Sequence, residues 1–204
     1  MLFLRNIKNS MIDFQTISKI FSDFLDEPHN DLNYADKIHL LIFLNIKTNK
    51  ILWDLEDSAR LAELGDKHVA ETKKNIDATN QFRNNLISEI DMILYKTLDI
   101  IPDSPDKFYS ESPGMIIDRM SIIFIKLSII QKLILLINED DLRSEYVIKE
   151  KILLFQVENI GNFFDMYIKK LIKKEMFFEI QQPVKIYNDK RINKYRDILK
   201  NSNH

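Results

Sequence analysis

The sequence predicts an all-α fold: a single-domain bundle of about five helices, with a polar site between the second, third and fourth. Apolar residues recur at intervals of three and four along nearly the whole chain, which is typical of amphipathic helices. Only 3 Gly and 5 Pro leave little material for the many turns of a β-rich fold. The 204 residues are enough for one sizeable core. We therefore expect one helical domain over residues 1–204, with its core at about 10–180 and an irregular basic tail at 181–204.

Start and stop signals set the boundaries of the five expected helices, which cover residues 10–25, 34–64, 67–98, 113–138 and 142–178. Gly65 is expected to cap the C-terminus of the second helix. Ser112 as N-cap and Pro113 as first-turn residue begin the fourth. We expect a bend at Gly161 in the last helix, which Pro183 stops before it can extend further.

Composition excludes several function classes. The net charge of −2 argues against generic nucleic-acid binding, and the lack of cysteine excludes disulfides and thiolate metal sites. The N-terminus carries no recognisable secretory signal. The most apolar segment, residues 115–137, contains Asp118, Arg119 and Lys126, and each charge at the centre of a membrane span costs roughly 2.5–3.5 kcal/mol. We therefore expect a buried core helix there, without a transmembrane segment, in a cytoplasmic protein.

Other chemistries lack their sequence signatures. The four histidines have no metal-ligand spacing. No glycine-rich phosphate loop, dinucleotide fingerprint or nucleophile elbow is present.

The second helix carries polar residues on its apolar face. On a wheel of about 100° per residue, Asn45, Asn49, Glu56 and Arg60 fall among the apolar side chains. Buried polar groups must be paired, so we expect them to pair with each other or with a facing helix. Glu56 and Arg60 are four residues apart and can pair directly. Such a buried polar network either fixes the register of the helices or forms a ligand site within the bundle.

The third and fourth helices add further polar groups. The third carries a stripe of amides and acids, namely Lys73, Asp77, Asn80, Gln81, Asn84, Ser88 and Asp91. Asn and Asp are poor helix formers, so the stripe indicates more than a solvated surface. In the fourth helix, Asp118 lies in line with isoleucines and is expected to be buried. The free backbone amides around Gly114, at the start of this helix, suit an anion such as phosphate.

Four ordered motifs carry a resemblance to a known family: LWxxEDxAR at 52–60, IDxxNQxRN at 76–84, ESPGxIIDRxSI at 111–122 and KxYND at 185–189. Over about residues 35–195 the chain resembles an uncharacterised family of bacterial helical proteins of unknown function, often encoded beside cell-envelope glycosyltransferases. The resemblance implies an all-helical fold and no established activity. The candidate ligand-binding residues are Asn49, Trp53, Glu56, Asp57, Arg60, Asp77, Asn80, Gln81, Arg83, Asn84, Gly114, Asp118, Arg119, Lys185, Tyr187 and Asn188.

This chain departs from the family pattern at three positions. Asn45 stands where the pattern tends to have His, Asn85 replaces an Asp, and Ser88 replaces a Glu. If those groups bind metal or transfer protons in relatives, the departures imply weakened or lost activity here.

Three functions are compatible with these residues. The leading hypothesis is an accessory protein of cell-envelope glycan assembly that binds a phosphorylated or sugar-containing ligand, or a partner glycosyltransferase. The second is a Mg²⁺-dependent phosphohydrolase acting on a nucleotide or sugar phosphate, with Glu56, Asp77 and Asp118 as metal ligands. The third is a purely structural helical adaptor. The sequence leaves the oligomeric state open.

The C-terminal segment has a basic bias. Between Lys169 and His204 there are ten Lys or Arg and four Asp or Glu. The bias is typical of a solvated tail, and it would also suit an anionic lipid, a phosphorylated substrate or a partner protein.

Overall fold

Five α-helices make up most of the chain that the computed structural model describes, namely residues 12–27, 34–61, 65–180, 190–192, 195 and 198. They are α2 (Phe14–Asp26), α3 (Lys37–Ala59), α4 (Gly65–Thr97), α5 (Pro113–Leu136) and α6 (Asp140–Ile172). Two short 3₁₀ turns, η2 (Pro105–Lys107) and η3 (Lys190–Ile192), complete the list. The predicted all-α, single-domain fold is confirmed.

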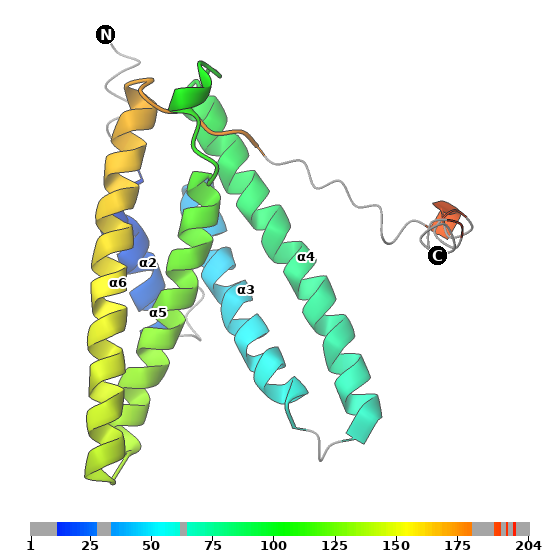
Figure 1. Cartoon of the computed structure of the whole chain (residues 1–204), viewed down its shortest axis with the longest axis vertical. Helices are drawn as coiled ribbons and strands as arrows, with labels where there is room; N and C mark the ends of the chain where they lie inside the picture. Colours follow the sequence, from blue (N-terminus) through cyan, green and yellow to red (C-terminus); the bar gives the residue numbers. More distant parts are fainter. Residues whose placement is uncertain are drawn as a thin grey trace.

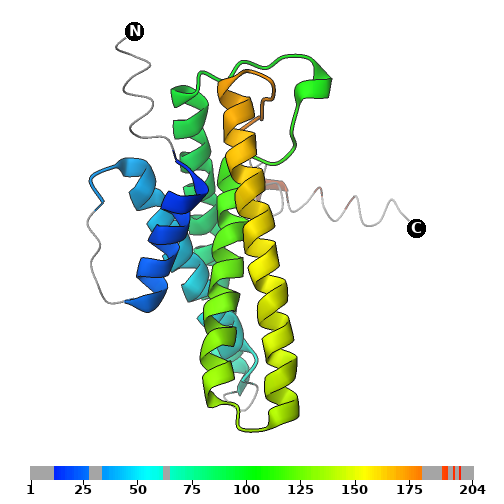
Figure 2. The ribbon, with the colours of Figure 1, turned by 90° about the vertical axis from the view of Figure 1, so that its left-hand side faces the viewer.

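The four long helices form two antiparallel hairpins, α3–α4 and α5–α6 (Figure 1). The hairpins meet at one end of the molecule and diverge toward the two helix-connecting loops at the other end. Short α2 lies across the bundle and packs against α3, α5 and α6 (Figure 2). Two cavities lie between α3, α4 and α5, and side chains of all three helices line them.

The apolar core lies where the hairpins meet. Its fully buried side chains come from every long helix, and the largest include Phe21, Ile42, Ile90, Ile117 and Phe164. The expectation that the fourth helix is buried holds for its first two thirds only, because Leu135 and Leu136 at the end of α5 are exposed. None of the described helices is long and apolar enough to cross a membrane.

Side-chain caps fix the starts of three helices. Asp13 and Asp36 accept hydrogen bonds from the backbone N–H groups of Thr16 and Ile38, at 2.8 and 3.0 Å. Ser112 caps α5 as predicted, with Pro113 in the first turn.

Two predicted helix ends are wrong. Gly65 does not cap the second helix: α3 ends at Ala59 with Arg60 as its C-cap, and Gly65, with a φ of +81°, is the first residue of α4. The last helix ends at Ile172 instead of Phe178, because Lys174 takes a φ of +60° and reverses the chain. Phe177 then forms an isolated β-bridge with Phe108. In the sequence, the buried residues Phe177 and Phe178 resemble the continuation of an apolar helix face.

Gly161 serves a close contact between helices. A Cβ atom there would lie 2.6 Å from the ring of Phe14, so only glycine lets α2 approach α6 so closely. The backbone N–H of Phe14 also donates to Asp165 Oδ1 at 2.7 Å, which ties the start of α2 to α6. The predicted bend at this glycine stays a prediction.

Candidate functional site

A hydrogen-bond network joins α3 to α5 and is centred on Asp118, which is partly buried, with a side chain 13% exposed, and not fully buried as expected. The side-chain amides of Asn45 and Asn49 both donate to Asp118 Oδ1, at 2.9 and 2.8 Å. Asn49 also donates to Ser121 Oγ at 2.6 Å and is only 4% exposed. The expectation that buried polar groups of α3 pair with a facing helix is confirmed for these two asparagines.

Arg83 brings α4 into contact with this network. Its Nε lies 3.9 Å from Asp118 Oδ1, an ion pair at the long end of the range. The Nε atom is buried and has no hydrogen-bond partner among the described residues. A buried guanidinium N–H that lacks an acceptor is costly, and Arg has a planar fork of donors suited to a carboxylate or phosphate. The side chain therefore has binding capacity that the described part of the chain does not use.

Two adjoining cavities open on either side of Arg83. The first, of about 250 Å³, is lined by Asn49, Leu52, Trp53, Glu56, Asp57, Arg60, Asn80, Arg83, Ile122 and Ile125. The second, of about 470 Å³, is lined by Arg83, Asn84, Ile87, Ser88, Asp91, Ser112, Met115, Asp118, Arg119 and Ile122. Arg83 and Ile122 line both cavities, so these form one cleft between α3, α4 and α5.

The helix start at Gly114 is already occupied by a side chain of the protein. The backbone N–H of Gly114 donates to Asp91 Oδ1 at 2.7 Å, and Ser112 Oγ donates to Asp91 Oδ2. A carboxylate from α4 thus takes the position at which we expected an external anion. A Cβ atom at Gly114 would lie 2.7 Å from both Asp91 Oδ1 and the Ile87 carbonyl oxygen, so glycine permits this contact.

Burial has the largest effect on the pKa of Asp91, whose residue is 4% exposed. It raises the pKa of this carboxyl to about 6, although the hydrogen bonds from Ser112 and Gly114 favour the charged form. Burial also raises the pKa of the nearby Tyr167 phenol, and the negative charge of Asp91 adds to that effect. Tyr167 donates its hydroxyl to the Glu111 carbonyl at 3.0 Å, so the end of α6 is fixed to the segment that precedes α5.

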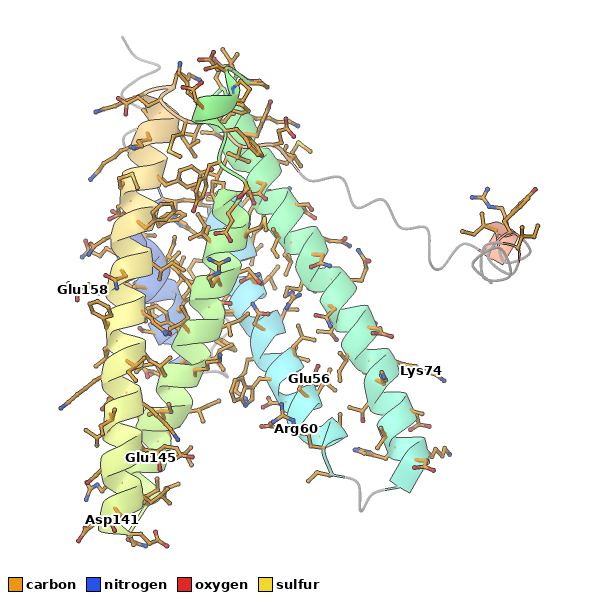
Figure 3. The ribbon with its side chains drawn as sticks, viewed as in Figure 1. Glu56, Arg60, Lys74, Asp141, Glu145 and Glu158 are labelled. Carbon is orange, nitrogen blue, oxygen red and sulfur yellow. The ribbon has the colours of Figure 1, made fainter. Side chains whose placement is uncertain are left out.

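Glu56 and Arg60 do not lie in the core, contrary to the wheel. Both are exposed on the last turns of α3, where the hairpins have diverged (Figure 3). Arg60 lies 3.7 Å from Asp57 and does not form the expected pair with Glu56. A wheel assigns a residue to the apolar face, but burial requires a helix packed opposite, and at this end of α3 that neighbour is too distant.

Most of the remaining candidates line the cleft. Asn49, Trp53 and Asn80 line the first cavity, while Asn84 and Arg119 line the second. Arg119 also pairs with Glu111.

Gln81 and Asp77 lie outside the cleft. Gln81 donates to Asn85 Oδ1 at 2.8 Å, and its own Oε1 is buried without a partner among the described residues. Asp77 is exposed and lines neither cavity. Within the described ranges, no group of three His, Cys, Asp or Glu side chains is arranged to hold a metal ion, so Glu56, Asp77 and Asp118 are not brought together.

Three predicted ligand-binding residues and two departures from the family pattern lie elsewhere. Lys185, Tyr187 and Asn188 lie outside the described residues. Asn85 is exposed beside Gln81, and Ser88 lines the second cavity and donates to the Asn84 carbonyl at 3.0 Å.

The candidate ligand-binding set omits four residues that organise the site: Asn45, Asp91, Ser112 and Ser121. The wheel singles out Asn45 as a polar residue on the apolar face of the second helix and Asp91 as part of the polar stripe of the third, whereas Ser112 is predicted only as a helix cap. Asp91 had a usable signal, since it follows Ile87 and Ile90 on the side of α4 that faces the core. Its partner at Gly114 could not be found by periodicity, because the two residues belong to different helices.

The fold and the cleft define an all-helical protein with a polar cavity between three of its helices. The sequence model of a family described as "Protein of unknown function (DUF4254)" matches residues 39–180, which is 142 of the 204 residues. The chain therefore belongs to this family of unknown function, as the resemblance in its motifs indicated. No curated protein matches the chain, and no solved structure matches it.

Proposed function

We propose that this protein binds a phosphorylated sugar in the cleft between α3, α4 and α5, as a cytoplasmic accessory protein of cell-envelope glycan assembly. One observation carries the proposal: Arg83 lines both cavities, and its buried Nε has no hydrogen-bond acceptor in the part of the chain that the structure describes. A phosphate oxygen would supply that acceptor.

The other residues of the first cavity suit the same class of ligand. Trp53 offers a broad apolar face with one polar edge, against which a sugar ring can pack. Asn80 and the carboxylates of Glu56 and Asp57 can exchange hydrogen bonds with hydroxyl groups. Arg60 adds a second guanidinium at the outer edge of the cavity.

The biological setting comes from the resemblance and not from the cleft. Genes beside cell-envelope glycosyltransferases imply that the ligand, or a partner enzyme, belongs to glycan assembly. The lack of cysteine is consistent with the cytoplasm.

The cleft favours ligand binding over the two alternatives. A purely structural adaptor would fill the space between its helices and give its buried polar groups hydrogen bonds, whereas Arg83 Nε has no hydrogen-bond acceptor among the described residues. A Mg²⁺-dependent hydrolase needs carboxylates that converge on one ion at about 2.1 Å. Of the three carboxylates considered for that role, Asp77 lies outside both cavities.

Differential scanning calorimetry against sugar phosphates, nucleotide sugars and Mg²⁺ tests the proposal. A ligand at 100 times its Kd should stabilise the protein by about 2.7 kcal/mol. We expect stabilisation by a sugar phosphate without Mg²⁺, and we expect Arg83→Gln to abolish it.

Arg143→Gln is the matched control, because Arg143 is exposed on α6 and lines neither cavity. This variant should respond as the wild type does. Stabilisation that requires Mg²⁺ and is lost in Asp118→Asn would favour the hydrolase. If no compound stabilises the protein, the purely structural adaptor becomes the favoured function.

A further inference from the structure

An apolar groove runs along the α5–α6 hairpin beside the cleft. It has a volume of about 410 Å³ and is lined mainly by Ile129, Ile130 and Leu133 of α5, Ile152 and Leu153 of α6, and Trp53 of α3. Most of its lining is aliphatic, unlike that of the first cavity. Such a surface releases water favourably when it is covered by an apolar group.

The groove is continuous with the polar cleft. Trp53 lines both the first cavity and the groove. On α5, Ile125 lines the cavity and the next residue, Lys126, lines the groove. From Ile122 in the cleft to Leu133 in the groove, α5 rises by about 16 Å at 1.5 Å per residue. One elongated molecule can therefore occupy both.

The apolar lining of the groove is open to solvent. Ile152, which lines it, is 52% exposed, and Leu135 and Leu136, which end α5 after Leu133 without lining the groove, are 80% and 72% exposed. Isolated exposed leucines are ordinary, but an apolar groove that stays open marks a binding surface. This feature indicates a ligand that is apolar at one end.

Basic side chains lie beside the apolar lining. Lys126 is exposed on α5 and lines the groove directly after Ile125, which lines the first cavity. It makes no ion pair with another described residue. Lys149 lines the groove on α6 and forms an ion pair with Glu145 at 2.6 Å. Lys126 therefore offers an unpaired positive charge at the boundary between the polar and the apolar surfaces.

We propose that the cleft and the groove together bind an anionic amphiphile: a phosphate-bearing sugar head in the polar cleft, joined to a prenyl or acyl chain in the groove. The proposal rests on the proposed function, since it assigns the head to the same cavity. It specifies the ligand as lipid-linked, with the phosphate at Arg83 in the cleft and the apolar chain in the groove that Trp53 and Lys126 border.

Trp53 provides the readout, because it is the only tryptophan of the chain and lies where cleft and groove join. The full chain is titrated with glucose 1-phosphate, farnesyl phosphate below its micelle concentration, and farnesol, while Trp53 fluorescence and heat are recorded. We expect farnesyl phosphate to bind about 100-fold more tightly than glucose 1-phosphate, since each buried methylene group adds affinity. Farnesol, which has no phosphate, should bind much more weakly than farnesyl phosphate.

Two matched variants test whether the prenyl chain of the ligand binds in the groove. Ile152 and Ile148 are both exposed isoleucines of α6, at 52% and 59%, but only Ile152 lines the groove. The affinity ratio of farnesyl phosphate to glucose 1-phosphate should fall about tenfold in Ile152→Asn. It should keep its wild-type value in Ile148→Asn. Circular dichroism confirms that both variants fold.

Each contrary outcome is informative. Equal affinities for farnesyl phosphate and glucose 1-phosphate would overturn the lipid-linked ligand and leave the sugar-phosphate function standing. Equal affinities for farnesol and farnesyl phosphate would also overturn the proposal, because the prenyl chain would then bind without the phosphate. Equal losses of affinity in the two isoleucine variants would overturn it as well, because the prenyl chain would then not bind in the groove. A dimer that Ile152→Asn dissociates would identify a second copy as the occupant. No binding of any probe would refute both proposals.

Discussion

Individual polar residues inside the bundle are held by partners on other helices. Asn45 and Asn49 of α3 share one carboxylate oxygen of Asp118 on α5, and Asn49 also reaches Ser121. A buried amide gains little net free energy from such bonds, but it loses several kcal/mol when a partner is missing. The network therefore sets the register of α3 against α5, and it also leaves Asp118 available to orient Arg83.

Replacing Asn49 by Ala should lower the free energy of unfolding by about 2 kcal/mol, because Ser121 and Asp118 lose a buried donor. Urea denaturation measures the loss. Asn75→Ala, at an exposed position of α4, should change stability by less than about 0.5 kcal/mol. A similar small effect at both positions would mean that the network does not stabilise the fold.

Asp91 should give stability a specific dependence on pH. Its pKa is about 6 in the folded protein and near 3.8 when the chain is unfolded. Between these values the unfolded chain releases the proton and the folded chain retains it, so stability falls as the pH rises from about 4 to about 6. Each pKa unit corresponds to about 1.4 kcal/mol, so the free energy of unfolding should fall by roughly 3 kcal/mol across this pH range.

Asp91→Asn should remove this component when unfolding free energies are measured from pH 4 to pH 7. Asp77→Asn, exposed on the same helix, should keep the wild-type pH dependence. If Asp91→Asn retains the wild-type slope, Asp91 does not titrate in this window.

At the scale of the helices, the predicted N-cap was correct and the predicted C-cap was wrong. Ser112 and Pro113 predicted the start of α5 correctly, because a cap acts through bonds within its own segment. Gly65 and Phe177 misled, since a glycine suits either end of a turn and an apolar pair can belong to a bridge as well as to a helix.

The candidate site could be predicted in part, for a related reason. Periodicity identified Asn49 and Asp118, and the family motif supplied Arg83; the three side chains meet between α3, α4 and α5. It placed Glu56 and Arg60 in the core because the wheel contains no information about where hairpins diverge. The partnership of Asp91 with Gly114 depends on tertiary contact alone, so one helix considered by itself could not predict it.

The junction between α4 and α5 should be intolerant of a single added methyl group. In Gly114→Ala the new Cβ would lie 2.7 Å from the backbone oxygen of Ile87, which cannot rotate away. We expect a loss of about 1–3 kcal/mol, measured as a lower denaturation midpoint. Ser110→Ala, at an exposed position just before the helix, serves as the control. Wild-type stability of Gly114→Ala would show that the two helices can separate without cost.

At the scale of the whole molecule, the folding unit is longer than the family match. The match begins at residue 39, yet α2 places Ile17, Ile20, Phe21 and Phe24 in the core. Phe21 meets Phe124 of α5 edge to face, with ring centroids 5.3 Å apart. Each large apolar side chain contributes about 1.5–3 kcal/mol when buried, so the four together rival the 5–15 kcal/mol of a typical domain.

A fragment of residues 39–180 should therefore lack a cooperative thermal transition, whereas residues 12–180 should retain one. Calorimetry of the two fragments distinguishes the cases. A sharp transition of the shorter fragment, at the temperature of the longer, would mean that α2 is dispensable for folding.

The contact between Asp91 and Gly114 also constrains how these two positions can change in evolution. The carboxylate from α4 neutralises the start of α5 from within, and the absence of a side chain at position 114 makes room for it. Loss of the acid alone would leave the Gly114 N–H without its acceptor, and a side chain at 114 alone would clash with Asp91, so selection should act on the two as a pair. Among relatives, we expect positions 91 and 114 to vary together, and a chain that has lost the acid should have reopened this helix start to an external anion.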